Sequence, residues 1–316
     1  MPDLKLAINV WCQTASWQEM LEAARRIDRL GYDQLYTWDH LYAIFGDPHQ
    51  PTYEAWTALA AWAMATERVK LGLMVGANPF RNPGLVAKTA TTLDHISGGR
   101  AILGLGAAWF EPEHRAFGID FGASVGQRLD WLDEAVGACR TLFDGGAVTS
   151  PAGGRYTFDD LRIAPLPVQR RMPILVGGTG RRKTLRTVAR YADMWNAFGL
   201  PDEVRELNDV LREHCADVGR NEREIERSIN LWMVIRDDEA EARRVWAEAM
   251  AHNWTPVERT MESSRPIFGP PAAIAARLRE YVDAGFGTTL VELPSPYDVE
   301  TIERLIGEVK PLVDAG

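Results

Sequence analysis

The dipeptide Asp39-His40 is the first pair of residues whose types could do chemistry. It follows directly after the apolar run 34–38, which is typical of a buried β-strand. Histidine titrates near neutral pH, so His40 could pass a proton to or from a substrate. The alternative is a hydrogen-bonded pair that only stabilises a loop, and the dipeptide alone favours it. A place at the end of a strand adds weight to the catalytic interpretation.

A second candidate is the glycine loop GGTG at residues 177–180, which follows an apolar run. Its spacing does not fit a P-loop, which would need glycine at Arg182. It does not fit a dinucleotide fingerprint either, which would need glycine at Lys183. Unpaired backbone N–H groups at a helix start still attract a phosphate, and Arg181 or Arg182 could pair with it. The basic run 181–183 could equally be a solvated helix face.

His114 follows the acids Glu111 and Glu113 and is a possible metal ligand by type. No HExxH or HxH spacing accompanies it. The sequence therefore predicts a solvated loop at this place and no metal site.

Composition and charge narrow the partners. The 316 residues include 35 basic and 44 acidic side chains, a net charge of −9, so nucleic acid and anionic membranes are unfavourable partners. The chain has no apolar run long enough to span a membrane and no secretion signal at its start. Three widely spaced cysteines indicate no disulfide framework. We therefore expect a cytoplasmic protein that acts on a small molecule.

The elements that must position these residues alternate along the chain. Apolar, β-rich runs predict eight strands, at 5–11, 34–38, 69–76, 101–105, 173–177, 193–197, 229–235 and 288–293. Helical periodicity follows each run, as in the helix 17–30 with Gly31 as its C-cap. Alternation of this kind predicts a parallel sheet, and eight units close into a (β/α)8 TIM barrel. A doubly wound open sheet is the alternative.

The chain contains no linker rich in Pro, Gly or Ser, so we expect a single domain over 1–316. The alternation of strand and helix patterns becomes irregular at three places, and insertions are expected there, near 107–126, 145–170 and 236–270. A last helix is expected at 299–309.

A TIM barrel carries its active site at the C-terminal ends of its strands. Asp39-His40 and the glycine loop both fall there, and so do several aromatic residues. Most such residues belong to the core, but together they would also suit a flat, conjugated ligand. They are Trp11, Trp38, Phe80, Trp109, Phe110, Trp195 and Phe198.

Taken together, these segments resemble the bacterial luciferase-like flavin/deazaflavin oxidoreductase superfamily, and within it the branch that depends on coenzyme F420, as known from actinobacteria. The segments span nearly the whole chain, and their order and spacing are more specific than any one of them. They are Trp38-Asp39-His40, LGLMVGANPFRNP (71–83), LDHISGGRAILGLGAAWFEPEHRAFG (93–118), PILVGGTGRRKTLRTVARYADMWNAFG (173–199) and AGFGTTLVELP (284–294).

The resemblance implies a (β/α)8 barrel that holds the cofactor's tricyclic ring over its mouth. It implies a non-proline cis peptide at the end of strand three, here at Met74-Val75 or Val75-Gly76. It also places proton transfer at His40, ring contact at Asp39 and the cofactor's phosphate on 177–181. The cofactor-binding residues implied are Asp39, Met74, Val75, Gly76, Ala77, Asn78, Gly106, Ala107, Ala108, Gly177, Gly178, Thr179, Gly180 and Arg181.

One departure from the family pattern concerns the partner of His40. Relatives that oxidise sugar phosphates carry a glutamate at the end of strand four, whereas this chain has Trp109 there and Glu111 two residues later. Trp109 and Glu111 are therefore the further catalytic candidates, and Glu111 or Glu113 must reach His40 to complete an acid–base pair. The departure argues against sugar-phosphate oxidation.

The resemblance implies an F420-dependent oxidoreductase that transfers a hydride between the deazaflavin C5 and a small organic substrate. An alternative on the same fold is a monooxygenase that uses reduced FMN and oxygen. The basic run 181–183 would suit the anionic tail of F420 and so favours the first. A third possibility is a barrel that has lost its cofactor and catalyses nothing. The family habit implies a homodimer.

Overall fold

The computed structural model of the chain describes residues 3–150, 152–263 and 265–315. Residues 151 and 264, in two of the expected insertions, and the outermost residues of the expected 1–316 domain lie outside the described residues.

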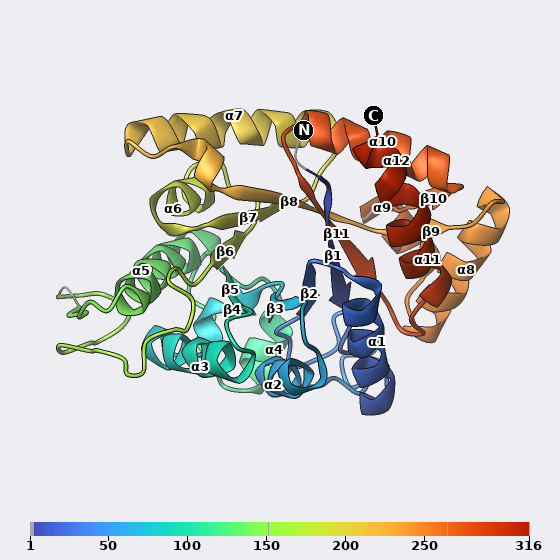
Figure 1. Cartoon of the computed structure of the whole chain (residues 1–316). Coiled ribbons are helices and arrows are strands. Elements are labelled where there is room, and N and C mark those ends of the chain that lie inside the picture. Colours follow the sequence, from blue (N-terminus) through green and yellow to red (C-terminus); the bar gives the residue numbers. More distant parts are fainter. Residues whose placement is uncertain (1–2, 151, 264, 316) are drawn as a thin grey trace.

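Parallel strands form a closed barrel (Figure 1). The nine-stranded sheet runs in the order β3-β2-β1-β11-β8-β7-β6-β5-β4, and an additional β3–β5 pairing closes it. Because β3 and β4 are successive pieces that both pair with β5, the barrel has eight positions. The predicted (β/α)8 barrel is confirmed, and the open sheet is wrong. The barrel strands are β1 (Lys5–Val10), β2 (Gln34–Thr37), β3 (Lys70–Leu73), β4 (Gly76–Ala77), β5 (Ala101–Gly106), β6 (Ile174–Gly177), β7 (Met194–Ala197), β8 (Glu226–Leu231) and β11 (Thr288–Leu293).

Helices surround the strands, as Figure 1 shows. The first has Ser16 as its N-cap, whose side chain forms a capping box with that of Glu19, and Gly31 as its C-cap with φ of 90°. Both ends are as predicted. The helices are α1 (Trp17–Leu30), α2 (Ala55–Ala65), α3 (Pro83–Ile96), α4 (Glu111–Ala116), α5 (Val125–Phe143), α6 (Thr184–Tyr191), α7 (Pro201–Asp217), α8 (Glu239–His252), α9 (Val257–Ser263), α10 (Pro271–Asp283), α11 (Val299–Arg304) and α12 (Lys310–Asp314), with a π-helical segment at Leu305–Val309.

Three predicted elements differ in the structure. The run 69–76 is interrupted at residues 74 and 75, which separate β3 from β4. The run 229–235 is divided between β8 of the barrel and β9 (Met233–Ile235), which pairs in parallel with β10 (Ile267–Gly269) in a separate two-stranded sheet. The last helix continues past 309 to Asp314.

The three expected insertions have different structures. The one near 107–126 contains α4, and the one near 236–270 contains α8, α9 and β10. The one near 145–170 is irregular, with an antiparallel bridge between Val148 and Leu161.

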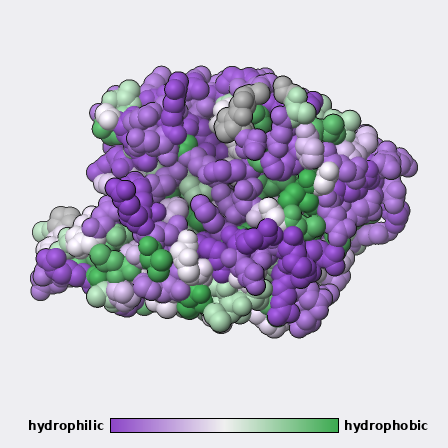
Figure 2. Space-filling view, in the orientation of Figure 1, coloured by the Kyte–Doolittle hydropathy of each residue, from purple (hydrophilic) through white to green (hydrophobic). Residues whose placement is uncertain are grey.

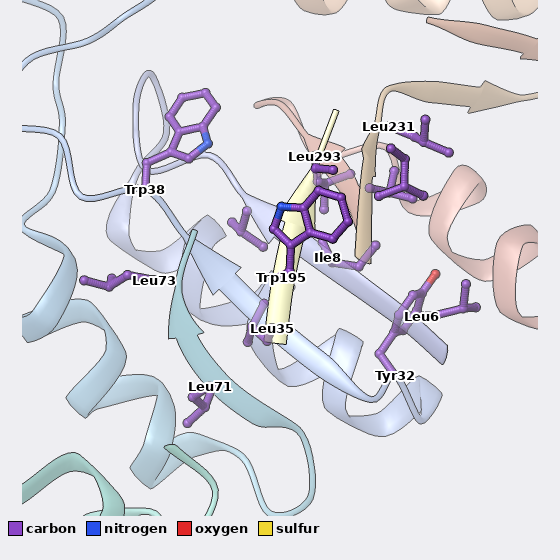
Figure 3. Close-up of a cluster of buried hydrophobic side chains, with 14 of the residues drawn as sticks. Leu6, Ile8, Tyr32, Leu35, Trp38, Leu71, Leu73, Trp195, Leu231 and Leu293 are labelled. Atoms are coloured by element: carbon purple, nitrogen blue, oxygen red, sulfur yellow. The ribbon is translucent and has the colours of Figure 1, made fainter. Parts of the chain in front are cut away.

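The hydrophobic core has two layers, one on each side of the barrel wall. The outer layer lies between strands and helices, and Figure 3 shows part of it, including Leu6, Ile8, Leu71 and Leu293. The inner layer fills the barrel and contains Ala7, Tyr36, Met74, Ile102, Leu175, Met194 and Leu290. Because side chains alternate along a strand, residues two positions further face the same interior near the mouth. They include Asn9, Asn196 and Glu292, which are all buried.

Hydrophilic residues cover most of the face seen in Figure 2, and hydrophobic residues gather in and beside a hollow near its centre. No helix of the described residues is long and apolar enough to cross a membrane. The three cysteines are buried and free, in line with the predicted absence of disulfides: Cys12, Cys139 and Cys215.

Close approach of two strands requires glycine at position 104. A Cβ on Gly104 would lie 1.9 Å from the backbone oxygen of Leu73, which is too close to be accommodated without moving β3 or β5. We therefore expect Gly104→Ala to lower the free energy of unfolding by roughly 1–3 kcal/mol in urea denaturation. The matched control is Gly287→Ala, because a Cβ there meets no atom within 4 Å. Equal urea midpoints for Gly104→Ala and the wild type would contradict this close contact.

Candidate active site

Asp39, directly after β2 and Trp38, holds the loop that follows β4. Its carboxylate accepts two hydrogen bonds from Arg81, at 2.7 and 3.0 Å, and one from the backbone N–H of Ala77 at 3.0 Å. Asp39 is only 2% exposed. Burial would lower the pKa of Arg81, but the charges of Asp39 and Glu54 raise it above its ordinary value. The pair is thus ionic, and the contact of Asp39 with a cofactor ring stays a prediction.

The strand break at residues 74 and 75 forms a bulge in the barrel wall. The Met74-Val75 peptide bond is cis, at the first of the two bonds predicted. Val75 packs against the inner core layer. A Cβ on Gly106 would lie 2.6 Å from Val75 Cγ2, and one on Gly177 would lie 3.1 Å from Val75 Cγ1. The two glycines on β5 and β6 therefore make room for the valine side chain.

His40 is hydrogen-bonded to a buried glutamate from α4. Its Nδ1 lies 2.8 Å from Glu113 Oε1, and Glu113 Oε2 accepts the backbone N–H of Leu41 at 2.8 Å. Glu113 is 1% exposed, whereas the His40 side chain is 13% exposed. Because a carboxylate only accepts, Nδ1 carries the hydrogen and Nε2 is the ring nitrogen left to exchange a proton with a ligand.

The structure selects one of the two acids and corrects one expectation about this insertion. Glu113 is the acid that contacts His40, whereas the exposed side chain of Glu111 lies 3.7 Å from Arg115. His114 is buried, with its Nδ1 3.1 Å from the Phe110 carbonyl oxygen, so the predicted solvated loop is wrong. Pro112 and the acids at the start of α4 suit the first turn of a helix.

The third catalytic candidate, Trp109, lies beside His40. It is 60% exposed, and the centroid of its ring lies 5.8 Å from that of His40 in an edge-on arrangement. The described residues contain no group of three or more His, Cys, Asp or Glu that could hold a metal ion.

The glycine loop is held by β7. The N–H of Gly178 donates to the Asn196 carbonyl oxygen at 3.0 Å, and Trp195 Nε1 donates to the Gly178 oxygen at 2.9 Å. Trp195 is therefore fully buried behind the loop, not at the barrel mouth. The backbone N–H groups of Thr179 and Gly180 donate to no described residue. They are the donors that an anion could take up.

Two of the three basic residues after the loop, Arg181 and Lys183, are paired with acids of neighbouring helices. Arg181 Nη2 lies 2.6 Å from Glu206 of α7, and Lys183 Nζ lies 2.7 Å from Asp130 of α5. All four side chains are exposed, so each pair adds little stability and can open for a ligand.

A cavity of about 920 Å³ opens beside the glycine loop. It reaches from Thr179 and Arg181 to Asn230 and Trp232 at the end of β8, and neither His40 nor Glu113 is among its lining residues. Its lining also includes the cations Arg243, Arg265 and Arg277 and the acids Glu203, Glu206 and Glu239.

Comparison with known proteins decides the family. Residues 7–288 match the family of luciferase-like monooxygenases. The chain belongs to this family.

Relatives in the luciferase-like family have diverse activities. An uncharacterized protein of Mycobacterium tuberculosis is 31% identical over 175 residues, which is 55% of this chain and 60% of that protein. The F420-dependent glucose-6-phosphate dehydrogenase of Kineococcus radiotolerans is 26% identical, over 98% of this chain and 97% of the enzyme. The FMNH2-dependent dimethylsulfone monooxygenase of Pseudomonas putida is 27% identical, over 72% of this chain and 61% of the enzyme.

Solved structures share the fold over nearly the whole length. An F420-dependent secondary alcohol dehydrogenase, solved with an F420-acetone adduct, superposes with a TM-score of 0.83 at 22% identity, covering 98% of this chain and 99% of that one. The F420-dependent tetrahydromethanopterin reductase of Methanopyrus kandleri gives 0.80 at 19% identity, with the same coverage of both chains.

The other predicted cofactor residues of this luciferase-like chain have mixed surroundings. Gly76 and Ala77 pair with β5. Asn78 is buried and donates from Nδ2 to the Tyr156 hydroxyl at 2.9 Å, so its amide faces the 145–170 insertion. Ala107 and Ala108 follow β5 directly, half-buried, and Ala108 has φ of 62°.

One carboxylate in the barrel interior is not among the site residues predicted from the sequence. Glu292 near the end of β11 is 4% exposed and accepts hydrogen bonds from Asn9, Trp11 and Asn230. Burial raises its pKa to about 7, although these hydrogen bonds act in the opposite direction. The sequence contains one indication of this residue, because an acid two residues after Leu290 falls on the same inward face of an apolar strand.

The structure predicts unequal effects for the two carboxylates that bind Arg81. Asp39→Asn leaves the largely buried guanidinium without its main partner, so we expect the free energy of unfolding to fall by roughly 3–5 kcal/mol. The matched control is Glu54→Gln, which keeps an oxygen for the N-cap of α2 and changes an exposed ion pair worth about 1 kcal/mol or less. Chemical denaturation compares both variants. Equal losses would show that the buried pair has no special weight.

Proposed function

We propose that the chain is an F420-dependent oxidoreductase that exchanges a hydride with a small organic substrate. The observation that carries the proposal is the His40–Glu113 pair at 2.8 Å, held at the C-terminal end of β2. A buried carboxylate that fixes one imidazole nitrogen leaves the other available for proton transfer, which is the usual arrangement of a histidine acid–base. The names of the Kineococcus relative and of the two solved structures support F420.

The residues present fit a flat ring with a phosphate-bearing side chain. Val75 rises from the barrel wall over Gly106 and Gly177, where any larger residue would displace it. The unpaired N–H groups of Thr179 and Gly180 suit one phosphate. The ring would lie on Val75, and the deazaflavin, when bound, supplies two-electron hydride chemistry at its C5 carbon.

The protein's part in the reaction is proton handling and orientation. Oxidation of an alcohol removes a hydride from its carbon and a proton from its oxygen. His40 Nε2 would take that proton, and the negative charge of Glu113 would stabilise the resulting imidazolium. In the direction of reduction, the same nitrogen would return a proton to the carbonyl oxygen. Trp109, edge-on to His40, would cover the reacting atoms from solvent.

A monooxygenase that uses reduced FMN and oxygen is the second candidate. The family description and the Pseudomonas relative favour it. Both cofactors carry a phosphate, so the glycine loop suits either. The tail of F420 is anionic and would have to displace Glu206 from Arg181 or Asp130 from Lys183. A barrel without catalytic function is disfavoured, since it would have no need of a buried glutamate directed at a partly exposed histidine.

Cofactor choice is tested by titrating the purified protein into F420 or FMN and following cofactor fluorescence. We expect binding of F420 in the micromolar range that is common for enzyme ligands, and much weaker binding of FMN. The opposite preference would replace the proposal with the monooxygenase, and no binding of either would favour the non-catalytic barrel.

The acid–base pair is tested by three variants once a substrate has been found by following F420 absorbance. His40→Ala should lower kcat by about 10²–10⁴-fold while cofactor affinity stays nearly unchanged. Glu113→Gln should also lower kcat, because the amide cannot stabilise the imidazolium. Glu111→Gln is the matched control and should be neutral, since this side chain is exposed and paired with Arg115. Loss of cofactor binding in His40→Ala would refute the proton-transfer role.

A further inference from the structure

Helix α4, which carries Glu113, is too short to keep its conformation by itself. It has 6 residues, below the roughly 12–15 that an isolated helix needs in water. All of them are described, and among them only Glu113 and His114 are buried. The position of the Glu113 carboxylate therefore depends on the contacts that these two side chains make with the rest of the chain.

His114 is the side chain that packs α4 onto its surroundings. Its ring contacts those of Phe80 and Phe121, with ring centroids 4.8 and 4.7 Å apart. Its Nδ1 donates to the Phe110 carbonyl oxygen at 3.1 Å, which fixes the orientation of the ring. His114 has no exposed surface, whereas Phe80 and Phe121 are half-buried. The imidazole therefore serves as the aromatic anchor of the helix.

The surroundings of His114 suit packing and not proton exchange. Its Nε2 is buried, and no described residue forms a hydrogen bond with it. Burial lowers the pKa of His114 below its ordinary value, and the nearby charge of Arg128 acts in the same direction. The ring is thus neutral at neutral pH and does not compete with His40 as a cationic partner of Glu113.

Three dipeptides from distant parts of the chain make a closed set of contacts. They are Asp39-His40, Phe80-Arg81 and Glu113-His114. Each pair of dipeptides shares one contact, and the three contacts are Asp39 with Arg81 at 2.7 Å, His40 with Glu113 at 2.8 Å, and Phe80 with His114 at 4.8 Å between ring centroids. Because the two residues of a dipeptide are covalently joined, each contact restricts the other two.

The contact of His114 with Phe80 is the one that ties α4 to the barrel by packing. Phe121 belongs to the same insertion near 107–126 as α4, so it cannot fix the helix relative to the strands. Phe80 ends the 3-10 segment Asn78–Phe80, which directly follows β4 and the strand break at Val75. The ring pair therefore links the chain after the break to the helix that carries the glutamate.

We propose that His114 is a positioning residue, which through its ring contact with Phe80 holds Glu113 against His40 and thereby fixes the tautomer of His40. With the contact in place, Glu113 accepts the Nδ1 hydrogen of His40 at 2.8 Å and the backbone N–H of Leu41 at 2.8 Å. Without it, the helix is no longer packed against the barrel, and water competes for the carboxylate. His40 then adopts the Nε2–H tautomer that a free histidine side chain prefers.

The catalytic consequence of this tautomer rests on the proposed function, whereas the placement of Glu113 does not. A neutral imidazole accepts a proton only at the ring nitrogen that carries no hydrogen. His40 can therefore take a substrate proton at Nε2 only while its own hydrogen is on Nδ1.

The first test reads the tautomer of His40 in the cofactor-free protein by NMR with ¹⁵N-labelled histidine, in mildly alkaline buffer where the ring is neutral. In the wild type we expect the Nδ1–H tautomer alone. Phe80→Ala and His114→Ala should each shift the ring toward the Nε2–H tautomer and move the backbone N–H resonance of Leu41. The double variant should show no further change, because both substitutions remove the same contact.

Two further variants separate positioning from a general loss of stability. His114→Phe keeps a ring against Phe80 and should retain the Nδ1–H tautomer of His40. Phe268→Ala is the matched control, because it removes a buried ring that contacts Trp246 at 6.5 Å in the insertion near 236–270. It should lower the urea midpoint and leave the tautomer unchanged.

The positioning role is overturned if His40 keeps the Nδ1–H tautomer in both alanine variants, whatever their urea midpoints. An equal loss of the tautomer in Phe268→Ala, or its absence from the wild type, has the same meaning. If His114→Ala does not fold, Phe80→Ala still decides, because Phe80 is only half-buried.

The second test follows turnover with F420 and a substrate found by F420 absorbance. His114→Ala should lower kcat by up to about 10²-fold with F420 affinity nearly unchanged, because the acid–base pair is misplaced. His114→Phe should restore most of the lost rate. An unchanged kcat in a variant that has lost the tautomer would overturn the link between His114 and catalysis. A wild-type protein that binds no F420 would overturn the proposed function instead, and the tautomer result would still stand.

Discussion

The inside of an eight-stranded barrel is only wide enough for side chains to fill it, and this limit governs the whole site. Where the strand between β2 and β5 breaks at Met74 and Val75, the valine enters the interior, and the next strands, β5 and β6, carry glycine at 106 and 177. The two glycines have no side chains there, and the side chain of Val75 occupies the space beside them. Other groups at the mouth lie close to Val75. Asp39 accepts a hydrogen bond from Ala77 in the chain that follows Val75, and the glycine loop begins at the end of β6.

Three buried carboxylates in and around the barrel have different partners. Asp39 faces a guanidinium, Glu113 faces an imidazole and a backbone N–H, and Glu292 faces only neutral donors. The first is a fixed part of the scaffold, because its partner is always cationic. The second holds one ring nitrogen of His40 and the backbone N–H of Leu41. Only the third has no partner able to compensate its charge, which is why burial dominates its pKa.

The sequence predicted the barrel because each strand is a short apolar run and each helix has a regular stripe. It predicted a cis bond at Met74-Val75 or Val75-Gly76 only through family resemblance, since local propensities contain no such signal. It failed for α4, because six residues are too few for a periodic pattern and their polarity is typical of a loop. It failed for Glu292 because the donors Asn9 and Trp11 lie more than 280 positions away along the chain. Pairings of that range are set by barrel closure and leave no local trace.

The origin of Glu113 has an evolutionary consequence. The histidine stands on a barrel strand end, while its carboxylate partner arrives on a short helix inside an insertion near 107–126. The glycine loop at 177–180 and the carboxylate partner of His40 therefore come from separate stretches of chain. Replacement of this insertion would change the partner of His40 and leave the glycine loop in place. Such modularity gives one scaffold a route to new chemistry through changes in a single loop.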